Sequence, residues 1–352
     1  MSKTLTVLHV NLAKGFRGGE RQTELLIRAL SKHFNTQQLL ACRKDSPLRD
    51  RLADIDNLSF VTANHQLSGH YTTPKVDIVH AHEAKAVHWA YVHKLLKSTP
   101  YIITRRVDTA VKDKWLNQKT YQNASALVGI STLIANHIRD KQWGEVYQIP
   151  STLAHLETNH KEGELFRSAF PGKTIVGHVG ALVDKHKGQK VLIEAAALLE
   201  KSHPNLQIVF FGDGADKEEL ESLSKGMTNI TWMGFKAKIG DYLPYFDLFA
   251  FPSRNEGLGS TLLDVMDANV PIIASNVGGI PDIVINNETG ILVPPNDSLA
   301  LKEAIIRLSS DKILQAKLVE GAKKQLENYT PQRMAESYSS LYHKITAKEN
   351  SL

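Results

Sequence analysis

The sequence predicts an α/β protein built from two doubly wound parallel sheets. The chain has 352 residues, more than one hydrophobic core usually supports, so two domains are expected. Apolar strand-like runs alternate with amphipathic helix-like segments, as in parallel sheets whose strands are joined by helical crossovers. A polar stretch that is poor in large apolar residues, 150–171, separates two such series and is the expected linker.

The first series predicts an N-terminal domain over residues 1–157. Its expected strands are 5–11, 38–42, 58–61, 76–81, 101–104 and 126–130, and its expected helices are 18–34 and 84–97. A second domain is expected over 172–330, with its first strand beginning at Thr174. A last helix, at about 331–346, completes the chain.

Charge is distributed unevenly between the two halves. The chain carries a net charge of +5, but residues 1–157 hold 21 Lys and Arg against 13 Asp and Glu, a net +8, which leaves −3 for the remainder. A basic first half indicates an anionic partner, such as membrane headgroups or nucleic acid. The basic residues form no recognisable nucleic-acid module, so no nucleic acid is expected. The lone Cys42 excludes an internal disulfide and suits the cytoplasm.

The most informative stretch is 247–274. It predicts a buried strand at 248–251, a helix at 260–268 and another strand at 270–274. Open parallel sheets bind ligands beyond the carboxyl ends of such strands. In the turn, Gly257 and Gly259 permit close approach of the backbone to a ligand.

This turn combines features that suit phosphate and hydroxyl groups together. The amides of four successive residues at the helix start, Leu258, Gly259, Ser260 and Thr261, suit a phosphate. Glu256 stands before the turn and Asp264 eight residues later. Acids beside a phosphate site are expected to accept hydrogen bonds from hydroxyls, and a nucleotide sugar offers both groups.

The segment Pro252-Ser-Arg-Asn-Glu-Gly-Leu-Gly259, followed by Asp264, resembles the E-x7-E signature of retaining GT-B glycosyltransferases of family 4. The resemblance covers about 173–346, and its further motifs are 177–188, 210–214, 276–282 and 287–293. It implies two Rossmann-like domains that face a central cleft. The first would bind the acceptor, the second would bind the nucleotide sugar, and the last helix would pack back on the first.

The resemblance also implies an activity. The chain would move a sugar, as a hexosyltransferase does, from a nucleotide-diphosphate sugar to a glycan or glycolipid acceptor, with retention of configuration. Lipopolysaccharide or other cell-surface polysaccharide synthesis is the expected setting. No cofactor is expected, and no metal either, because the His80-Ala-His82-Glu83 segment lacks a zinc-like or facial-triad spacing.

Particular roles follow from the resemblance. Glu256 would contact the sugar, Asp264 the ribose and Lys187 the diphosphate, while the Gly18–Gly19 loop would face the diphosphate across the cleft. The expected catalytic residues are Glu256, Lys187, Arg106 and Asp108. The expected donor-binding residues are Gly18, Gly19, Lys187, Arg254, Glu256, Gly257, Leu258, Gly259, Ser260, Thr261 and Asp264.

Two positions depart from the family pattern. Relatives often place a histidine where this chain has Arg106, and a guanidinium cannot act as an acid–base group at working pH. Arg106 or Arg105 could hold an anionic acceptor or the donor phosphates, with Asp108 orienting the acceptor hydroxyl; an Arg106–Asp108 ion pair is the alternative. The arginine that relatives carry beside the lysine is replaced by Ala181. Its charge could be supplied by Arg17, Arg106 or Arg254.

The acceptor site is expected to involve Arg17, His82, Glu83 and Arg105. For His82 and Glu83, a hydrogen-bonded histidine at a strand end beside a capping glutamate is the alternative. Two other functional classes stay open. A sugar-nucleotide epimerase or hydrolase of the same architecture would use the His82–Glu83 pair as its proton-abstracting group. A non-catalytic nucleotide-sugar-binding domain would account for Ala181 and Arg106.

The basic segment 111–121 bears on location. Its lysines, with Trp115 and Leu116, suit a helix at the interface of an anionic membrane. A cytoplasmic protein bound peripherally to the inner face of the cytoplasmic membrane is one expectation. Packing of Trp115 and Leu116 on the core, with the lysines in solvent, is the other.

Overall fold

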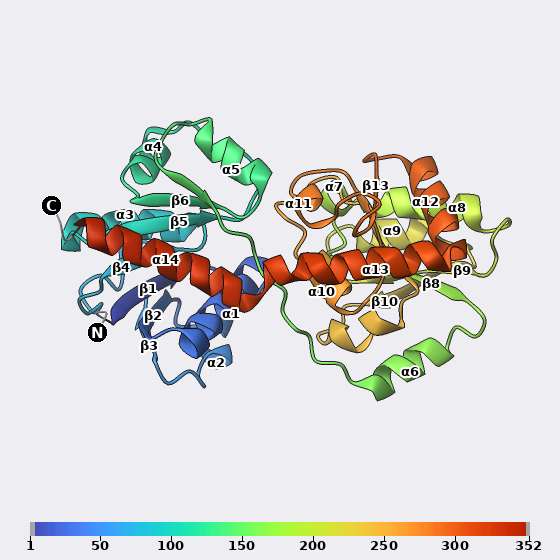
Figure 1. Ribbon diagram of the computed structural model, residues 1–352, viewed down its shortest axis with the longest axis horizontal. Coiled ribbons are helices and arrows are strands. Elements are labelled where there is room, and N and C mark those ends of the chain that lie inside the picture. Colours follow the sequence, from blue (N-terminus) through green and yellow to red (C-terminus); the bar gives the residue numbers. More distant parts are fainter. Residues whose placement is uncertain (1–3, 350–352) are drawn as a thin grey trace. The chain divides into compact units, whose positions relative to one another are not determined.

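The computed structural model describes residues 4–349 and divides the chain into two compact units (Figure 1). Among the described residues, unit 1 comprises 4–152 and 329–349, and unit 2 comprises 153–328. The C-terminal helix therefore belongs to the same unit as the N-terminal strands. Within residues 4–349, no helix has both the length and the apolar character needed to cross a membrane.

Unit 1 contains a seven-stranded parallel sheet of order β3-β2-β1-β4-β5-β6-β7. Its strands are β1 Leu5–Asn11, β2 Thr36–Cys42, β3 Leu58–Thr62, β4 Ile78–Ala81, β5 Tyr101–Arg105, β6 Ala126–Gly129 and β7 Val146–Gln148. Its helices are α1 Gly18–His33, α2 Pro47–Arg51, α3 Ala84–Lys97, α4 Trp115–Gln122, α5 Thr132–Arg139 and α14 Pro331–Glu349. The strand order reverses between β1 and β4, and ligands of open α/β sheets bind at the carboxyl edge of such a switch point.

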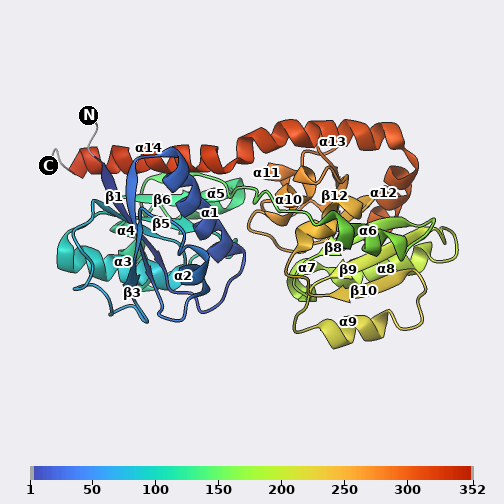
Figure 2. The same ribbon diagram turned by 90° about the horizontal axis from the view of Figure 1, so that it is seen from below.

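Helices α1 and α14 cover one face of this sheet (Figure 2). Val7, Ile78 and Ile102 project from β1, β4 and β5 into that layer. The buried side chains of α14 include Tyr338 and Tyr342, one helical turn apart. This spacing places them on one face of the helix, so α14 is docked along a continuous stripe.

Unit 2 contains a six-stranded parallel sheet of order β10-β9-β8-β11-β12-β13. Its strands are β8 Thr174–Val179, β9 Leu206–Phe211, β10 Ile230–Gly234, β11 Leu248–Phe251, β12 Ile272–Ser275 and β13 Ile291–Val293. Its α-helices are α6 His160–Ser168, α7 Asp184–Lys187, α8 Gln189–Leu199, α9 Lys217–Leu223, α10 Thr261–Asp267, α11 Ile280–Ile283, α12 Ser298–Ser310 and α13 Lys312–Leu326. Short 3-10 turns lie at Ile239–Asp241, Leu243–Tyr245 and Glu327–Tyr329.

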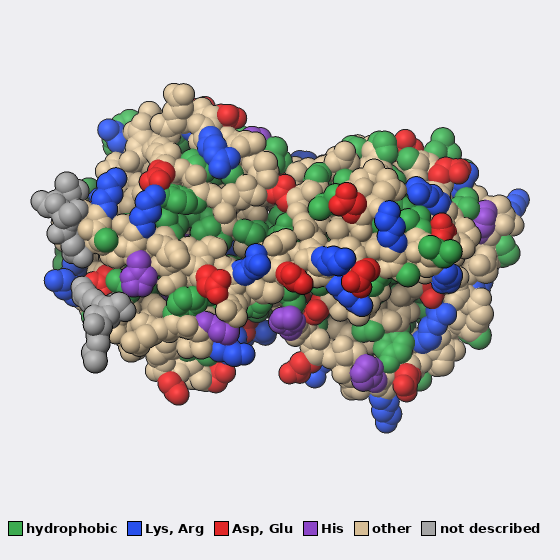
Figure 3. Space-filling model, in the orientation of Figure 1, with side chains coloured by type: hydrophobic (Ala, Val, Ile, Leu, Met, Phe, Trp, Pro, Cys, Tyr) green, Lys and Arg blue, Asp and Glu red, His purple; other side chains and the backbone are tan. Residues whose placement is uncertain are grey.

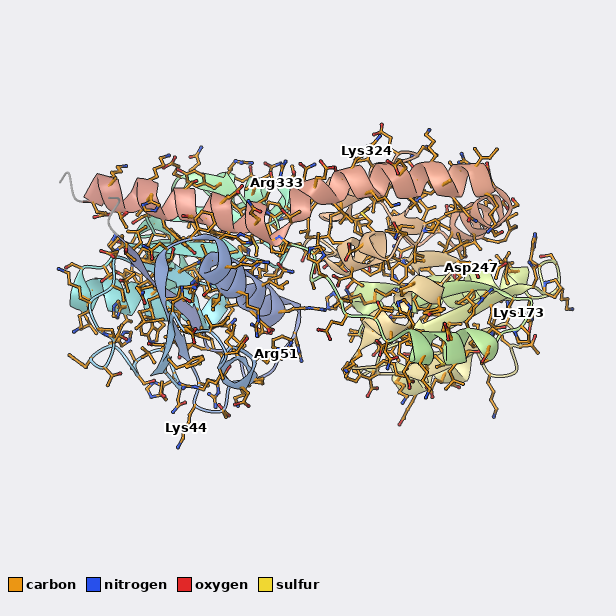
Figure 4. All side chains as sticks on the ribbon, turned by 60° about the horizontal axis from the view of Figure 1, so that its bottom comes forward. Lys44, Arg51, Lys173, Asp247, Lys324 and Arg333 are labelled. Atoms are coloured by element: carbon orange, nitrogen blue, oxygen red, sulfur yellow. The ribbon has the colours of Figure 1, made fainter. Side chains whose placement is uncertain are left out.

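Asp247 fixes the amino edge of the unit 2 sheet. It lies just before β11, and Lys173 lies just before β8 at the same edge (Figure 4). The Asp247 carboxylate accepts the N–H of Ile175 at 2.7 Å and a guanidinium N–H of Arg167 at 3.1 Å. This contact sets the register of β8 against β11, and hence the relative positions of the loops at their carboxyl ends.

The segment 150–171, expected to be a linker, contains helix α6. Asn159 caps the helix by accepting the N–H of Lys161. Phe166 is buried among the rings of four further residues, Phe170, Phe211, Tyr242 and Phe246. A single buried aromatic side chain thus anchors a segment whose overall composition is polar.

Candidate functional site

The loop between β11 and α10 lies at the carboxyl edge of the unit 2 sheet. Strand β11 ends at Phe251 and α10 begins at Thr261, as the sequence predicts within one residue. Gly259 has a φ of +83°, a left-handed conformation that glycine adopts without strain. The loop thus follows the central strand of the sheet and turns sharply into a helix.

This loop brings Glu256 against Lys187, the last residue of α7. The Lys187 ammonium forms an ion pair with the Glu256 carboxylate. The Ser253 hydroxyl donates to the same carboxylate oxygen at 3.1 Å. The ammonium also lies 5.3 Å from the centre of the Phe251 ring. A cation and a hydrogen-bond acceptor therefore stand side by side, as binding of a group with both phosphate and hydroxyls requires.

Two glycines shape the backbone around this pair. Gly278, with a φ of +60°, lies so close to Glu256 that a Cβ would be 2.1 Å from its carbonyl oxygen. The neighbouring Gly279 N–H donates to that carbonyl at 3.0 Å. Gly188, with a φ of +65°, approaches the carbonyl of Pro252 to the same distance. Both glycines belong to motifs recognised in the sequence, but their contacts with this loop were not predicted.

Arg254 is held within unit 2. Its Nη1 donates to the carboxylate and, at 2.6 Å, to the carbonyl of Asp184, and its Nε donates to Asn296 Oδ1. The charge of Arg254 is thus balanced by Asp184, which makes it a poor substitute for the arginine missing at Ala181. Asp264, on α10, accepts the N–H of Ala154 at 3.1 Å.

A buried polar pair that the sequence did not reveal lies next to Ala181. The His178 Nδ1–H donates to Ala250 O at 3.0 Å, and burial lowers the pKa of His178 to about 4. Gln189 Nε2 donates to Ala181 O at 2.9 Å and faces His178 Nε2 at 3.4 Å. Among the described residues, Gln189 Oε1 is buried and has no donor. An acceptor is thus left unsatisfied beside the position that departs from the family pattern.

In unit 1, the Gly18–Gly19 loop opens the 16-residue helix α1. Glu20 accepts the N–H of Arg17 at 2.9 Å, which fixes the first turn. A Cβ at Gly19 would lie 3.8 Å from Arg106 Cδ, so Arg106 packs against this loop. The amino end of a helix favours anions, and a guanidinium beside it adds a full positive charge.

Arg106 is only partly satisfied. Its Nη2 donates to His82 Nδ1 at 3.4 Å, whereas its Nε is buried and without an acceptor in the described part of the chain. Burial lowers the pKa of Arg106 from its ordinary value, and Tyr338 and Glu20 oppose that shift; an arginine nevertheless stays charged. Between 4 and 349 there is no Arg106–Asp108 ion pair, so the alternative that the sequence allowed is wrong. The site retains capacity for an anion.

His82 and Glu83 are both engaged inside unit 1. The Glu83 carboxylate accepts the N–H groups of Lys85 at 2.7 Å, Ala86 at 2.8 Å and Leu12 at 3.1 Å, and so caps α3. His82 is buried and lies 3.0 Å from His9. The structure therefore matches the second interpretation, a hydrogen-bonded histidine beside a capping glutamate. The acceptor role expected for these residues stays a prediction.

Of the remaining predicted residues of unit 1, Arg105 ends β5, Arg17 directly precedes α1 and Asp108 lies in the loop after β5. Arg105 donates to the carbonyl of Thr109. Arg17 is exposed at the start of α1. Asp108 offers its carbonyl to His137 Nδ1 at 2.9 Å, which leaves its carboxylate out of that contact.

Helix α4 presents apolar side chains to solvent. Trp115 is 70% exposed and Leu116 is 45% exposed, whereas Thr120 and Tyr121 are the buried members of the helix. Packing of Trp115 and Leu116 on the core, one of the two expectations, is therefore wrong. Lys112, Lys114 and Lys119, in α4 and the loop before it, are exposed as well. Figure 3 shows separate Lys and Arg side chains among apolar and acidic ones on one face of unit 1.

The fold and the loop site together define a class. Two Rossmann-like units, each built on a parallel sheet, are typical of the GT-B architecture. Residues 161–325 match the model of the family described as Glycosyl transferases group 1.

Comparison with known proteins agrees with that assignment. The chain is 28% identical over 247 residues to the alpha-D-kanosaminyltransferase of Streptomyces kanamyceticus, which covers 65% of this chain and 62% of that protein. It is 27% identical over 190 residues to the capsular polysaccharide biosynthesis glycosyltransferase CapM of Staphylococcus aureus, covering 53% of this chain and 50% of that protein. The matched segment thus spans about half to three-fifths of these curated relatives.

A solved structure extends the likeness of fold to nearly the whole chain. The structure of Anabaena Alr3699/HepE in complex with UDP and glucose has a TM-score of 0.79, covers 97% of this chain and 100% of that chain, and is 16% identical in sequence. The GT-B architecture expected from the sequence is confirmed.

Proposed function

We propose that this chain is a glycosyltransferase that moves a sugar from a nucleotide-diphosphate sugar to a glycan or glycolipid acceptor. The Lys187–Glu256 pair at the carboxyl edge of unit 2 carries the proposal, because it lies inside the segment that matches the glycosyltransferase family model. The kanosaminyl and capsular relatives transfer sugars according to their names. Synthesis of lipopolysaccharide or another cell-surface polysaccharide is the setting we propose.

The two residues of the pair would bind different parts of the donor. The Lys187 ammonium would hold the diphosphate and stabilise the negative charge that develops on it as it leaves. The Glu256 carboxylate would accept hydrogen bonds from sugar hydroxyls, and the amides of 258–261 would contribute further donors. Binding would therefore exchange one intramolecular ion pair for contacts with the ligand, which keeps both charges partnered.

Retention of configuration is part of the proposal. Glu256 is the carboxylate at the loop, and its pairing with Lys187 and Ser253 disfavours its use as a nucleophile. In the front-face reaction that we favour, the bond between the sugar and the diphosphate oxygen breaks and a bond to the acceptor oxygen forms on the same face. The proton of the acceptor hydroxyl passes to the departing diphosphate. No metal is required, since Lys187 and the backbone amides neutralise the leaving group.

Unit 1 would contribute an anion site for a phosphate-bearing substrate. Arg106 and the Gly18–Gly19 helix entry supply positive charge there, and the unsatisfied Nε of Arg106 supplies a donor. Arg17, Arg105 and Asp108 would act in binding or orienting the acceptor. An epimerase or hydrolase that uses His82 and Glu83 as a base is disfavoured, because His82 is buried and Glu83 is occupied by three backbone amides.

Peripheral binding to an anionic membrane is also proposed. The exposed indole of Trp115, with exposed lysines on the same helix and on the loop before it, suits the boundary between headgroups and acyl chains. A glycolipid acceptor would then be reached at the cytoplasmic face.

The test is a transfer assay preceded by a donor screen. UDP-, GDP- and ADP-sugars are first ranked by the rise in melting temperature that each produces, because a ligand that binds only the folded state stabilises it. Transfer to glycan and glycolipid acceptors is then measured with the best donor. We expect Glu256→Ala to lower kcat by about 100-fold or more, and Glu194→Ala, at an exposed acid on α8, to leave it unchanged. Unaltered turnover in Glu256→Ala would contradict the assignment, and tight donor binding with no transfer would favour a non-catalytic binding domain.

A further inference from the structure

The face of the unit 1 sheet beneath α14 changes from apolar to polar toward its carboxyl edge. Along β1 the buried side chain of Val7 is followed on the same face by His9, and along β5 Ile102 is followed by Thr104. On β4 Ile78 is followed by His80, and His82 comes next. Alternate residues of a strand share a face. A buried polar layer is thus built directly beneath Arg106.

Hydrogen bonds give one branch of this layer a fixed direction. Gln38 Nε2 donates to Ile27 O at 3.1 Å and to Ser31 Oγ at 2.9 Å, so Gln38 Oε1 must accept. It lies 3.0 Å from His9 Nε2, which therefore carries the proton. A neutral imidazole has one donor and one acceptor, so His9 Nδ1 accepts.

The direction continues to Arg106. His9 Nδ1 lies 3.0 Å from His82 Nε2, which must donate to it. His82 Nδ1 is then the acceptor, and it receives a hydrogen bond from Arg106 Nη2 at 3.4 Å. Burial, together with neighbouring His80, His9 and Arg106, keeps the pKa of His82 well below its ordinary value. The sequence of donors and acceptors from Gln38 to Arg106 is thus consistent only with neutral rings.

A second branch of hydrogen bonds connects the layer to helix α14. His80 lies 2.7 Å from the Tyr342 hydroxyl and 2.7 Å from Thr104 Oγ1, which in turn lies 2.9 Å from the Tyr338 hydroxyl. Nitrogens of His9, His80 and His82 lie within 4.8 Å of one another, as metal ligands do. Each of their ring nitrogens already has a hydrogen-bond partner, and Arg106 places a positive charge beside them, so a hydrogen-bonded layer fits these side chains better than a metal site.

We propose that Gln38, His9 and His82 form a positioning relay that holds the Arg106 guanidinium against the Gly18–Gly19 loop. Because the relay is neutral, His82 Nδ1 accepts a hydrogen bond from Arg106 Nη2 and does not repel it. The Nε–H of Arg106 is then the donor that is left for an anion. His82 is a positioning residue in this scheme, and Arg106 is the group that meets the anion. That last role rests on the proposed function, whereas the relay itself does not.

The charged and titratable groups that face the relay are His80 on β4, Glu20 on α1, Tyr338 and Tyr342 on α14, and Arg106 itself after β5. Protonation of His82 would remove the acceptor for Nη2 and place two cations in contact. Acid should therefore weaken both the binding of an anionic ligand and the stability of unit 1.

The first test measures the hydrogen bonds of the relay and does not depend on activity. Nitrogen-15 spectra of the intact chain at pH 7 should show both His9 and His82 protonated at Nε2 and unprotonated at Nδ1, and Arg106 Nε–H exchanging slowly with water. In His82→Gln, whose amide replaces Nε2 but offers nothing at the position of Nδ1, that exchange should accelerate about tenfold. In His82→Asn, whose Oδ1 takes the place of Nδ1, the acceleration should be smaller. Opposite tautomers, or equal exchange in His82→Gln and the unaltered chain, would overturn the proposal.

The second test concerns function. His82→Gln should raise KM for the donor or acceptor that carries phosphate about tenfold, with His82→Asn restoring part of the loss. His93→Gln, which removes another buried histidine outside this layer, should change stability but not KM. If no donor supports transfer by the unaltered chain while the tautomers are as predicted, the proposed function fails and the relay stands. Equal KM in both His82 variants and the unaltered chain would show a purely structural histidine and overturn the relay.

Discussion

Gly278 lies against the carbonyl oxygen of Glu256, so closely that a methyl group on its Cα would be 2.1 Å away. The carbonyl also accepts the N–H of Gly279 at 3.0 Å. The loop after β12 therefore determines where the backbone of Glu256 lies, and through it where the carboxylate meets Lys187.

Gly278→Ala should consequently displace Glu256. We expect a loss of about 2–3 kcal/mol in the free energy of unfolding, from the positive φ and the clash together, and a donor affinity at least tenfold weaker. Gly226→Ala is the matched control, because Gly226 has a φ of +87° and nothing within 4 Å of the added methyl. Denaturant unfolding and calorimetric titration with the best donor measure both effects. Equal donor affinity in the two variants would contradict this role of Gly278.

Lys187→Met tests the role proposed for Lys187, which is to stabilise the leaving diphosphate. Glu256, which is 12% exposed, would lose its ion-pair partner, so we expect about 1–3 kcal/mol of destabilisation and a fall in kcat of about 100-fold. Lys185→Met is the control, since Lys185 is exposed on the same short helix. Melting curves and transfer rates are the measurements. A kcat close to that of the control would exclude Lys187 from leaving-group stabilisation.

Arg254→Met tests whether Arg254 has a structural role or binds the donor. Asp184 is only 12% exposed, and its loss of a partner should cost about 2–3 kcal/mol of stability. If Arg254 serves only to hold α7 to the loop, the donor dissociation constant should change less than threefold at a temperature where the variant is folded. A tenfold weaker donor would instead show that Arg254 supplies the charge missing at Ala181. Calorimetric titration decides between the two.

Acid should destabilise unit 1 through its histidines. Burial lowers the pKa of His9 to about 4, with the Gln38 hydrogen bond opposing the shift, whereas an unfolded histidine titrates near 6.5. The unfolded state thus binds more protons between these values, so stability is fully present above about pH 6.5 and falls as pH drops toward about 4. His9 alone accounts for about 3 kcal/mol over that range. Urea unfolding should give a smaller free energy of unfolding at pH 5 than at pH 7. In His9→Asn this difference should be smaller, and an unchanged difference would contradict a neutral buried His9.

Local pattern predicted much of the fold. Helix α3 was expected at 84–97 and is found there. It was predictable because the residues that determine it, its buried face and the capping Glu83, are close together in the sequence. Strand β7 and helix α5 were not predicted, since they are only three and eight residues long. Helix α6 was not predicted because one aromatic residue, Phe166, determines its docking.

The site was predictable in its residue types but not in its contacts. Glu256 and Lys187 could each be named from their motifs, yet their ion pair joins positions 69 apart. The role of Asp184 in binding Arg254 depends likewise on the start of α7 meeting the loop after β11. Of the histidine layer, the sequence revealed only the spacing of His80 and His82. The direction of its hydrogen bonds depends on Gln38, which lies on another strand.

The most direct test of the central claim is a crystal structure of this chain with a bound nucleotide sugar. We expect the diphosphate within hydrogen-bond distance of Lys187 Nζ and a sugar hydroxyl that donates to the Glu256 carboxylate, with the ion pair between Lys187 and Glu256 opened or shared. A ligand bound elsewhere, with Lys187 and Glu256 still paired only to each other, would contradict it.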